Sequence, residues 1–125
     1  MVVGIGIDLV EWARLERSLE RWGDRLVAKL MDADEAQALP PQGEARVQAL
    51  ALAVAGKEAA SKALGTGWSL GVRWRDVVVG RGPSPSVRLA GRAAEVARQL
   101  GSSGEALVSL EIRGSLAIGE VWLLS

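Results

Sequence analysis

The sequence predicts one α+β domain in which the strands pair mostly antiparallel. Its 125 residues suit a single domain spanning residues 1–125, and the 49% that are apolar are enough to form a core. The expected order is one strand, a group of helices, and then short strands around one further helix. This order is typical of the α+β class, because strands and helices do not alternate regularly along the chain.

The chain is expected to open with a buried strand at residues 2–9. In this segment Val3, Ile5 and Ile7 alternate with other residues, which is the spacing of side chains on one face of a strand. Asp8 is expected on the opposite face. We therefore expect the three apolar side chains to be buried together.

Short helices are predicted to follow this strand. Apolar residues at helical spacing predict a helix over residues 11–21, and Gly23 ends it as a C-terminal cap. Asp24 is expected to cap a second helix that continues through Leu30. Residues 32–38 are expected to add one more turn or two.

A long helix is predicted over residues 44–64. It follows a proline-containing loop at 40–43, is rich in alanine and leucine, contains no proline and stops at Gly65. Gly56 within it costs up to roughly 1 kcal/mol relative to alanine. This glycine therefore indicates close packing or the approach of a ligand.

The C-terminal half is predicted to contain four short strands and one helix. Turns rich in glycine, proline and serine separate its apolar segments. The expected strands are residues 77–79, 87–90, 106–112 and 116–124, and the expected helix is residues 92–100.

The composition excludes several kinds of site. The chain has neither cysteine nor histidine, so it can form no disulfide, no thiolate metal site and no catalytic thiol. It also lacks the commonest acid–base group and the commonest zinc ligand. Any catalysis must therefore use carboxylates, lysine, or water on a hard metal ion.

Charge and hydropathy argue against nucleic acid and membrane partners. The formal net charge is zero, which gives no overall attraction to nucleic acid. Between residues 73 and 98 lie six arginines and two acidic residues, which indicates either a local basic surface or an ordinary solvated face. No apolar segment is long enough to span a bilayer, and the N-terminus is a poor signal peptide, so a cytoplasmic location is expected.

One group of side chains has the chemistry of a phosphate-binding site. Glu58 and Lys62 are four residues apart on the predicted long helix and therefore share a face. If the first strand packs along this helix, Asp8 approaches Glu58. Two carboxylates with open coordination positions suit Mg²⁺, which binds through one or two carboxylates and substrate phosphates. Lys57 and Ser61 beside them would then hold phosphate oxygens.

The same residues have plainer interpretations. A glutamate four residues before a lysine is also an ordinary surface pair, worth only about 0.2–0.5 kcal/mol. A charge in an apolar strand is costly without a partner, but Asp8 also suits an open strand end or the N-cap of the helix that starts near Glu11. Spacing leaves these alternatives open. The five tryptophans are expected to be core or interface anchors: Trp12, Trp22, Trp68, Trp74 and Trp122.

Four segments follow one another along essentially the whole chain: GIGIDLVE at 4–11, GKEAASKALGTG at 56–67, GVRWRDV at 71–77 and PSVRLAGRAAE at 85–95. In this order they resemble motifs of the holo-acyl-carrier-protein synthases of the 4′-phosphopantetheinyl transferase superfamily. An aspartate near the N-terminus followed by a KEAxxKAxG pattern is specific. The resemblance implies that superfamily's fold, an antiparallel sheet packed with one long helix and several shorter ones.

The resemblance also implies an activity and its residues. Such enzymes move 4′-phosphopantetheine from coenzyme A to a serine of apo-acyl carrier protein, leaving 3′,5′-ADP. Asp8 and Glu58 match the family's magnesium ligands, Lys62 matches a lysine near the pyrophosphate, and all three are expected to be catalytic. Without histidine, Glu58 or a water that it holds is the expected base for the serine. The expected contacts of coenzyme A are Lys57, Ser61, Lys62, Gly65 and Pro85.

The resemblance further implies partners. Members of the family are homotrimers with active sites between subunits, and their first helix, basic on one side, receives the acidic carrier protein. Arg14, Arg17 and Arg21 fit that docking surface, and Arg25 lies near it in the sequence. Burial of one face in an oligomer would also help a domain of this small size.

Two departures from the family pattern concern polar groups expected near coenzyme A. Ala53 and Val54 replace an Arg-Phe pair, and Glu111 and Ile112 replace a Ser/Thr-His pair. Arg113 or Arg46 would have to compensate. Three hypotheses follow: an active phosphopantetheinyl transferase, a catalytically impaired binding or structural trimer, and a related transferase with altered ligand contacts or another carrier. Retention of the three catalytic residues favours the first.

Overall fold

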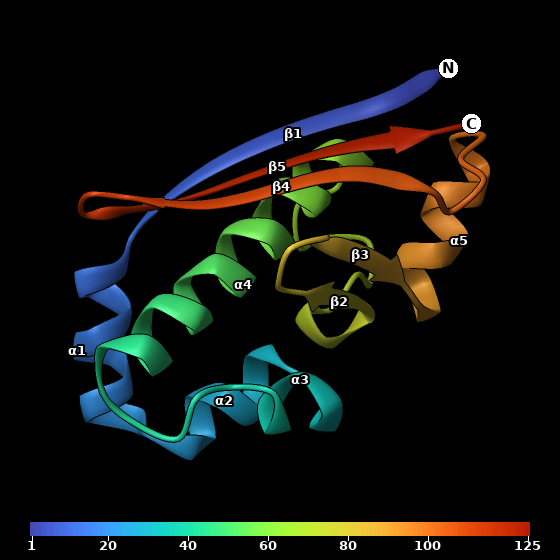
Figure 1. The fold of residues 1–125 in the computed structure, drawn as a ribbon. Coiled ribbons are helices and arrows are strands. Elements are labelled where there is room, and N and C mark those ends of the chain that lie inside the picture. Colours follow the sequence, from blue (N-terminus) through green and yellow to red (C-terminus); the bar gives the residue numbers. More distant parts are fainter.

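In the computed structural model, which describes residues 1–125, a three-stranded sheet lies over one long helix (Figure 1). Strands β1 (Val2–Glu11), β5 (Leu116–Leu124) and β4 (Ala106–Arg113) form this sheet in that order, and both pairings are antiparallel. The long helix is α4 (Gly43–Leu64). The α+β class and the antiparallel pairing expected from the sequence are therefore confirmed.

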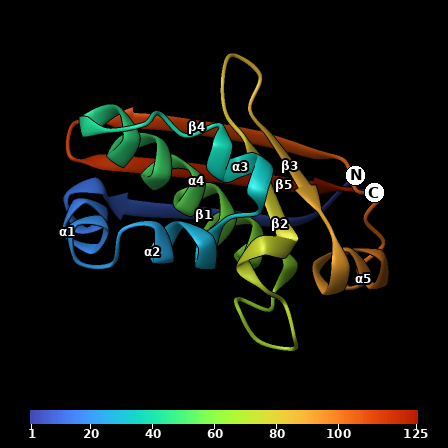
Figure 2. The ribbon, with the colours of Figure 1, turned by 90° about the horizontal axis from the view of Figure 1, so that it is seen from below.

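The remaining elements surround α4 on the sides away from the sheet (Figures 1 and 2). A 3₁₀ turn precedes the second, two-stranded antiparallel sheet, which is a hairpin. None of the helices combines the length and the apolar character needed to span a bilayer. The elements are α1 (Trp12–Trp22), α2 (Asp24–Leu30), α3 (Ala33–Gln37), the 3₁₀ turn η1 (Trp74–Asp76), β2 (Val77–Gly80), β3 (Ser86–Leu89) and α5 (Gly91–Gln99).

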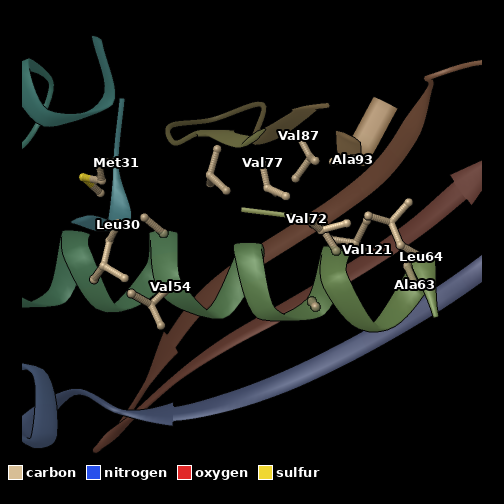
Figure 3. Packing of buried hydrophobic residues seen from close by; sticks show 14 of the residues in the cluster. Leu30, Met31, Val54, Ala63, Leu64, Val72, Val77, Val87, Ala93 and Val121 are labelled. Atoms are coloured by element: carbon tan, nitrogen blue, oxygen red, sulfur yellow. The ribbon is translucent and has the colours of Figure 1, made fainter. Parts of the chain in front are cut away.

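Helix α4 is apolar on nearly all sides because other elements cover it from several directions. One face meets β1 and β5, and other faces meet α1, the β2–β3 hairpin and α5. Figure 3 shows Val77 and Val87 of the hairpin pointing toward α4, and Val121 of β5 close to its C-terminal end. A helix buried in this way has no single apolar stripe.

The sheet touches α4 through glycines. A Cβ atom at Gly4 or Gly6 of β1 would overlap the backbone of α4, and one at Gly119 of β5 would lie 2.5 Å from the Ala55 carbonyl oxygen. The helix residues at these contacts are Ala55, Ala59 and Ala63, which recur every four positions and form one small-residue stripe. Helix and strands therefore approach at backbone distance. Gly56 packs less tightly, since a Cβ atom there would lie 3.1 Å from the Leu110 side chain and 3.2 Å from that of Val79, and its role is packing.

The burial predicted for β1 was wrong for Ile5 and Ile7, whereas Val3 is half-buried and packs against the core. Ile5 and Ile7 lie on the outer face of the sheet and are 51% and 52% exposed, whereas Gly4, Gly6 and Asp8 face α4. The helix lies so close to this strand that branched side chains do not fit between them. The alternating isoleucines therefore mark the outer face of the sheet, although alternation alone predicted a buried one.

Gly23 ends α1 as expected, whereas the cap expected at Asp24 does not form and the cap of α3 was not predicted. Asp24 does not cap α2: it is the first helical residue, Gly23 is the N-cap, and the only ion pair of Asp24 is a 3.4 Å contact with Arg46. Asp32 does cap α3. Its Oδ1 accepts from the Glu35 N–H at 2.8 Å, and Glu35 Oε1 accepts from the Asp32 N–H at 3.1 Å.

A buried ion pair connects α3, α4 and β2. Lys57 Nζ lies 2.9 Å from Glu35 Oε1 and also donates to the carbonyl oxygens of Trp74 and Val77. Glu35 Oε2 accepts from the Val79 N–H at 2.8 Å. Burial lowers the pKa of Lys57, and the Glu35 carboxylate opposes that change. Since the lysine uses all three donors, the network is satisfied and its loss is costly.

We expect Lys57→Met to lower the free energy of unfolding by roughly 3–5 kcal/mol, because it leaves the Glu35 carboxylate buried without its cation. Urea denaturation monitored by circular dichroism measures this loss. Lys29→Met, which removes an exposed lysine of α2, is the matched control and should change stability by less than about 0.5 kcal/mol. Equal stability of the two variants would contradict the role assigned to the pair.

Candidate active site

A cavity of about 480 Å³ opens between β1, α1 and the middle of α4. Strand β1 contributes Asp8 to its wall, and α4 contributes Glu58 and Lys62. The side chains come together because β1 lies on the small-residue stripe of α4, directly beside the turn that carries Glu58. The rest of the lining is Leu9, Val10, Arg14, Leu15, Ser18 and Val54.

Lys62 pairs across the fold with Asp8. Its Nζ lies 2.7 Å from Asp8 Oδ1 and 3.2 Å from the carbonyl oxygen of Ile7. The structure contains no ion pair between Glu58 and Lys62, so the ordinary surface pair allowed by the spacing does not form. Asp8 is not an N-cap either, because Glu11 holds that position for α1. Neither the Glu58–Lys62 surface pair nor the Asp8 N-cap is therefore present in the structure.

Glu58 has an unusual electrostatic environment. Burial is the largest cause of a raised pKa at Glu58, and the nearby Asp8 carboxylate raises it further. The Trp68 indole and the Lys62 ammonium oppose this rise. A half-buried carboxylate beside a second carboxylate favours binding of a proton or a cation. The cavity thus combines two acidic groups, one flexible lysine and, from α1, one arginine.

Two of the predicted coenzyme A contacts face away from this cavity. Lys57 is fully buried in the ion pair with Glu35, so its assignment as a coenzyme A contact is corrected. Lys57 points to a different side of α4 from Glu58, because successive helical residues are rotated by about 100°. Ser61 is also buried, and its hydroxyl donates to the Glu58 carbonyl oxygen at 2.7 Å.

Gly65 and Pro85 lie outside regular helices and strands and do not line the cavity. Gly65 ends α4 in the left-handed conformation, with φ of 80°, and its N–H donates to the Lys62 carbonyl oxygen. Pro85 immediately precedes β3. The loop between β2 and β3 and the loop after α4 project on opposite sides of the molecule in Figure 2.

The residues that depart from the family pattern can be located in the structure. Ala53 is buried in the core, and Ile112 packs against the alanines of α4. Glu111 lies on the outer face of β4, where Arg113 Nη2 pairs with it at 2.9 Å. Since Glu111 points away from the cavity, it brings no negative charge to it. Arg46 donates to the Pro40 carbonyl oxygen and does not line the cavity either.

Two residues of the site were not predicted from the sequence. Ser18 lines the cavity from α1 and lies one helical turn after Arg14, so the four-residue spacing was a usable signal. Trp68 influences Glu58 from the turn after α4, and no local pattern indicated that contact. No group of three acidic, histidine or cysteine side chains gathers to form a metal site. A divalent cation in this cavity would have two protein carboxylates.

Comparisons with known proteins agree with this fold. The family model described as the 4′-phosphopantetheinyl transferase superfamily matches residues 4–114. A relative named holo-[acyl-carrier-protein] synthase from Halorhodospira halophila is 45% identical over 100% of this chain and 99% of its own. The holo-[acyl-carrier-protein] synthase structure from Neisseria meningitidis has a TM-score of 0.85 at 26% identity and covers both chains completely.

A second solved structure carries a nucleotide ligand. It is a holo-(acyl-carrier-protein) synthase from Bacillus anthracis in complex with CoA (3′,5′-ADP). Its identity to this chain is 29% and its TM-score is 0.75, over 100% of this chain and 98% of the other.

We expect Glu58→Gln to raise the melting temperature at pH 7 in the presence of a chelator. A carboxyl group whose pKa is raised on folding contributes stability below its ordinary pKa of 4.5, and this contribution is lost as the pH rises through the folded value. The advantage of the variant should therefore disappear below pH 4.5. Differential scanning fluorimetry across pH measures it, with Glu105→Gln on an exposed loop as the control. A pH-independent difference would contradict the assigned environment.

Proposed function

The chain belongs to the holo-acyl-carrier-protein synthases of the 4′-phosphopantetheinyl transferase superfamily, and we propose that it transfers 4′-phosphopantetheine from coenzyme A to a serine of an apo-acyl carrier protein. The observation that carries this proposal is the convergence of Asp8, Glu58 and Lys62 in one cavity, in a chain related over its whole length to such synthases. The cytoplasmic location expected for this reaction stays a prediction.

The reaction has one bond-forming and one bond-breaking event. The serine oxygen attacks the phosphorus that bears pantetheine, and the bond from that phosphorus to the bridging oxygen breaks. The bridging oxygen leaves as part of 3′,5′-ADP, and the serine proton passes to a base. Glu58 suits this base because its raised pKa brings it closer to the working pH, and no histidine competes for the role.

The carboxylates of the cavity fit a magnesium ion. Asp8 and Glu58 would hold it, and the pyrophosphate and water would complete its shell, since Mg²⁺ is usually bound by one or two carboxylates together with substrate phosphates. When bound, the ion would neutralise charge on the transferred phosphoryl group and on the leaving group. The mutual repulsion that raises the pKa of Glu58 is a reason for this pair to favour a cation.

Lys62 is suited to bind the pyrophosphate of coenzyme A while the leaving group departs. Its ammonium pairs with Asp8 at 2.7 Å, while half of its side chain is exposed to solvent. A cation on Asp8 would compete with this pair and free the ammonium group. The lysine would then donate to the leaving phosphate oxygens and stabilise the charge that develops on them.

The outer face of the main sheet supports a homotrimer. Ile5, Ile7, Leu9 and Leu107 are each more than half exposed on this face, in a chain of only 125 residues. Large exposed apolar patches mark interaction sites. Copies of this chain are the partner that we propose, because the cavity is also incomplete within one chain. Pro85, an expected coenzyme A contact, does not line it, and a neighbouring subunit could supply that loop.

Helix α1 suits an acidic carrier protein. Arg14, Arg17 and Arg21 are exposed on it, and Arg14 also lines the cavity, so the proposed docking surface adjoins the proposed reaction centre. At the end of the helix, Trp22 is 46% exposed, and the guanidinium groups of Arg21 and Arg25 lie 4.9 and 5.9 Å from its ring centroid. Aromatic and arginine side chains are the commonest interface hot spots.

A second candidate function is a catalytically impaired trimer that binds coenzyme A or carrier protein. The observation that favours it is the apolar surroundings of Ala53 and Ile112, where the family pattern has polar groups. Such a protein would bind ligand without transferring it.

We expect incubation with magnesium, coenzyme A and an apo-carrier protein to add one phosphopantetheine mass to the carrier. Glu58→Gln should slow this transfer by at least about a hundredfold, because it removes a base and a metal ligand. Intact-mass spectrometry over time measures the rate, and Glu105→Gln is the control. Binding of coenzyme A without mass gain on several carriers would favour the impaired trimer.

We expect Arg14→Glu with Arg21→Glu to weaken carrier binding and reduce its salt dependence, while coenzyme A binding persists. Surface plasmon resonance at several salt concentrations measures the first effect, and calorimetry measures the second. Arg98→Glu on α5 reverses a charge elsewhere and serves as the control. Unchanged carrier affinity in the double variant would refute the docking surface.

We expect Leu107→Asp to convert a trimer into monomers, because it would bury an unpaired charge between the subunits. Light scattering at micromolar concentration gives the mass of each variant. Leu100→Asp changes an exposed leucine outside the main sheet and should remain trimeric. A wild-type chain that is monomeric in this measurement would exclude the proposed trimer.

A further inference from the structure

One buried polar atom stands out in the molecule. Among the buried side-chain nitrogen and oxygen atoms of the chain, only Trp68 Nε1 has no hydrogen-bond partner. A buried donor without a partner costs about 1–3 kcal/mol. Folded proteins satisfy nearly all such groups, so an exception requires a physical explanation.

The Trp68 side chain is held in place from two directions. Its turn folds back on α4, where the Gly67 N–H donates to the Ser61 carbonyl oxygen at 3.1 Å. The indole stacks on Trp74 with ring centroids 4.0 Å apart and an interplanar angle of 20°. Trp74 is itself attached to α4 through its carbonyl oxygen, which accepts from Lys57. The indole therefore has little freedom to reach a partner elsewhere.

The group that its N–H can reach is the Glu58 carboxylate. Ser61 lies one helical turn after Glu58 and bonds to its carbonyl oxygen, so the turn that carries Trp68 returns to this part of α4. The indole is near enough to Glu58 to lower the pKa of that carboxyl group, although the two do not meet at hydrogen-bonding geometry. A small rotation of the half-buried Glu58 side chain would form a hydrogen bond with Trp68 Nε1 and satisfy this donor.

We propose that Trp68 is a positioning residue, whose indole N–H donates a hydrogen bond to the Glu58 carboxylate and fixes its orientation in the cavity. The inference rests on the proposed role of Glu58 as base and metal ligand. A carboxylate has two oxygens with several acceptor positions, so one oxygen can take the indole N–H while the other faces the cavity. Because indole is neutral, it orients the carboxylate but leaves the negative charge of Glu58 unpaired. The ammonium group of Lys62 would instead form an ion pair with it.

The direct test is nuclear magnetic resonance of the five indole N–H groups in ¹⁵N-labelled protein, without magnesium or coenzyme A. Trp68→Phe identifies the Trp68 resonance by its loss. In Glu58→Gln this resonance should move upfield, because a carboxylate is a stronger acceptor than an amide. Asp8→Asn removes an equal charge from the same cavity and should leave the resonance nearly unmoved. No shift in Glu58→Gln, or equal shifts in both variants, would overturn the proposal.

A kinetic test separates positioning from packing. Trp68→Phe keeps the stack on Trp74 and removes only the donor, so kcat should fall about tenfold while KM for coenzyme A changes little. Trp74→Phe shrinks the other ring of the stack and reports the cost of packing alone. Similar losses of kcat in both variants would assign Trp68 a structural role. If the wild type transfers nothing, the proposed function fails, while the magnetic resonance result still decides whether Trp68 bonds to Glu58.

Discussion

The contact between α4 and the sheet, at backbone distance, is the constraint on which the site depends. Gly6 of β1 lies against the Ala59 carbonyl group, and Gly4 lies against that of Ala63. Asp8 is two residues beyond Gly6 and therefore shares its face of the strand. Glu58 is the neighbour of Ala59 along the helix. The small residues that let the two elements touch also bring the two carboxylates into one cavity, and a larger residue at either glycine would push them apart.

This contact also explains why neighbouring residues of α4 have opposite environments. The helix is buried on most sides, so each side chain is defined by the element that it faces. Lys57 faces α3 and β2, where Glu35 and backbone carbonyl oxygens use its three donors. Lys62 is five residues further on, about 140° around the helix, and faces the cavity and solvent. One lysine therefore stabilises the fold, whereas the other is free to exchange partners.

The sequence predicted most of the elements and the acidic pair, because these depend on local spacing and on a specific motif. It predicted that Ile5 and Ile7 of β1 are buried, although they are exposed, since alternation of isoleucine and glycine does not show which face the helix covers. It assigned Lys57 to coenzyme A because Lys57 lies beside Glu58 in the sequence, and the buried partner of Lys57, Glu35, lies in a segment expected only to add a turn or two. The contact of Trp68 with Glu58 depends on how a turn folds back on the helix, and no spacing within the sequence encodes that.

The outer face of the main sheet carries one charged residue among its exposed apolar side chains. Glu120 lies at its centre, opposite Ile7 of β1 and Ser109 of β4. Its Oε1 accepts a hydrogen bond from Trp122 Nε1 at 2.7 Å, so one oxygen of the carboxylate already has a partner within the same chain. A carboxylate satisfied within its own chain is less costly to bury than a free one. The same face can therefore present its leucines and isoleucines to a neighbouring copy, although a charged residue lies among them.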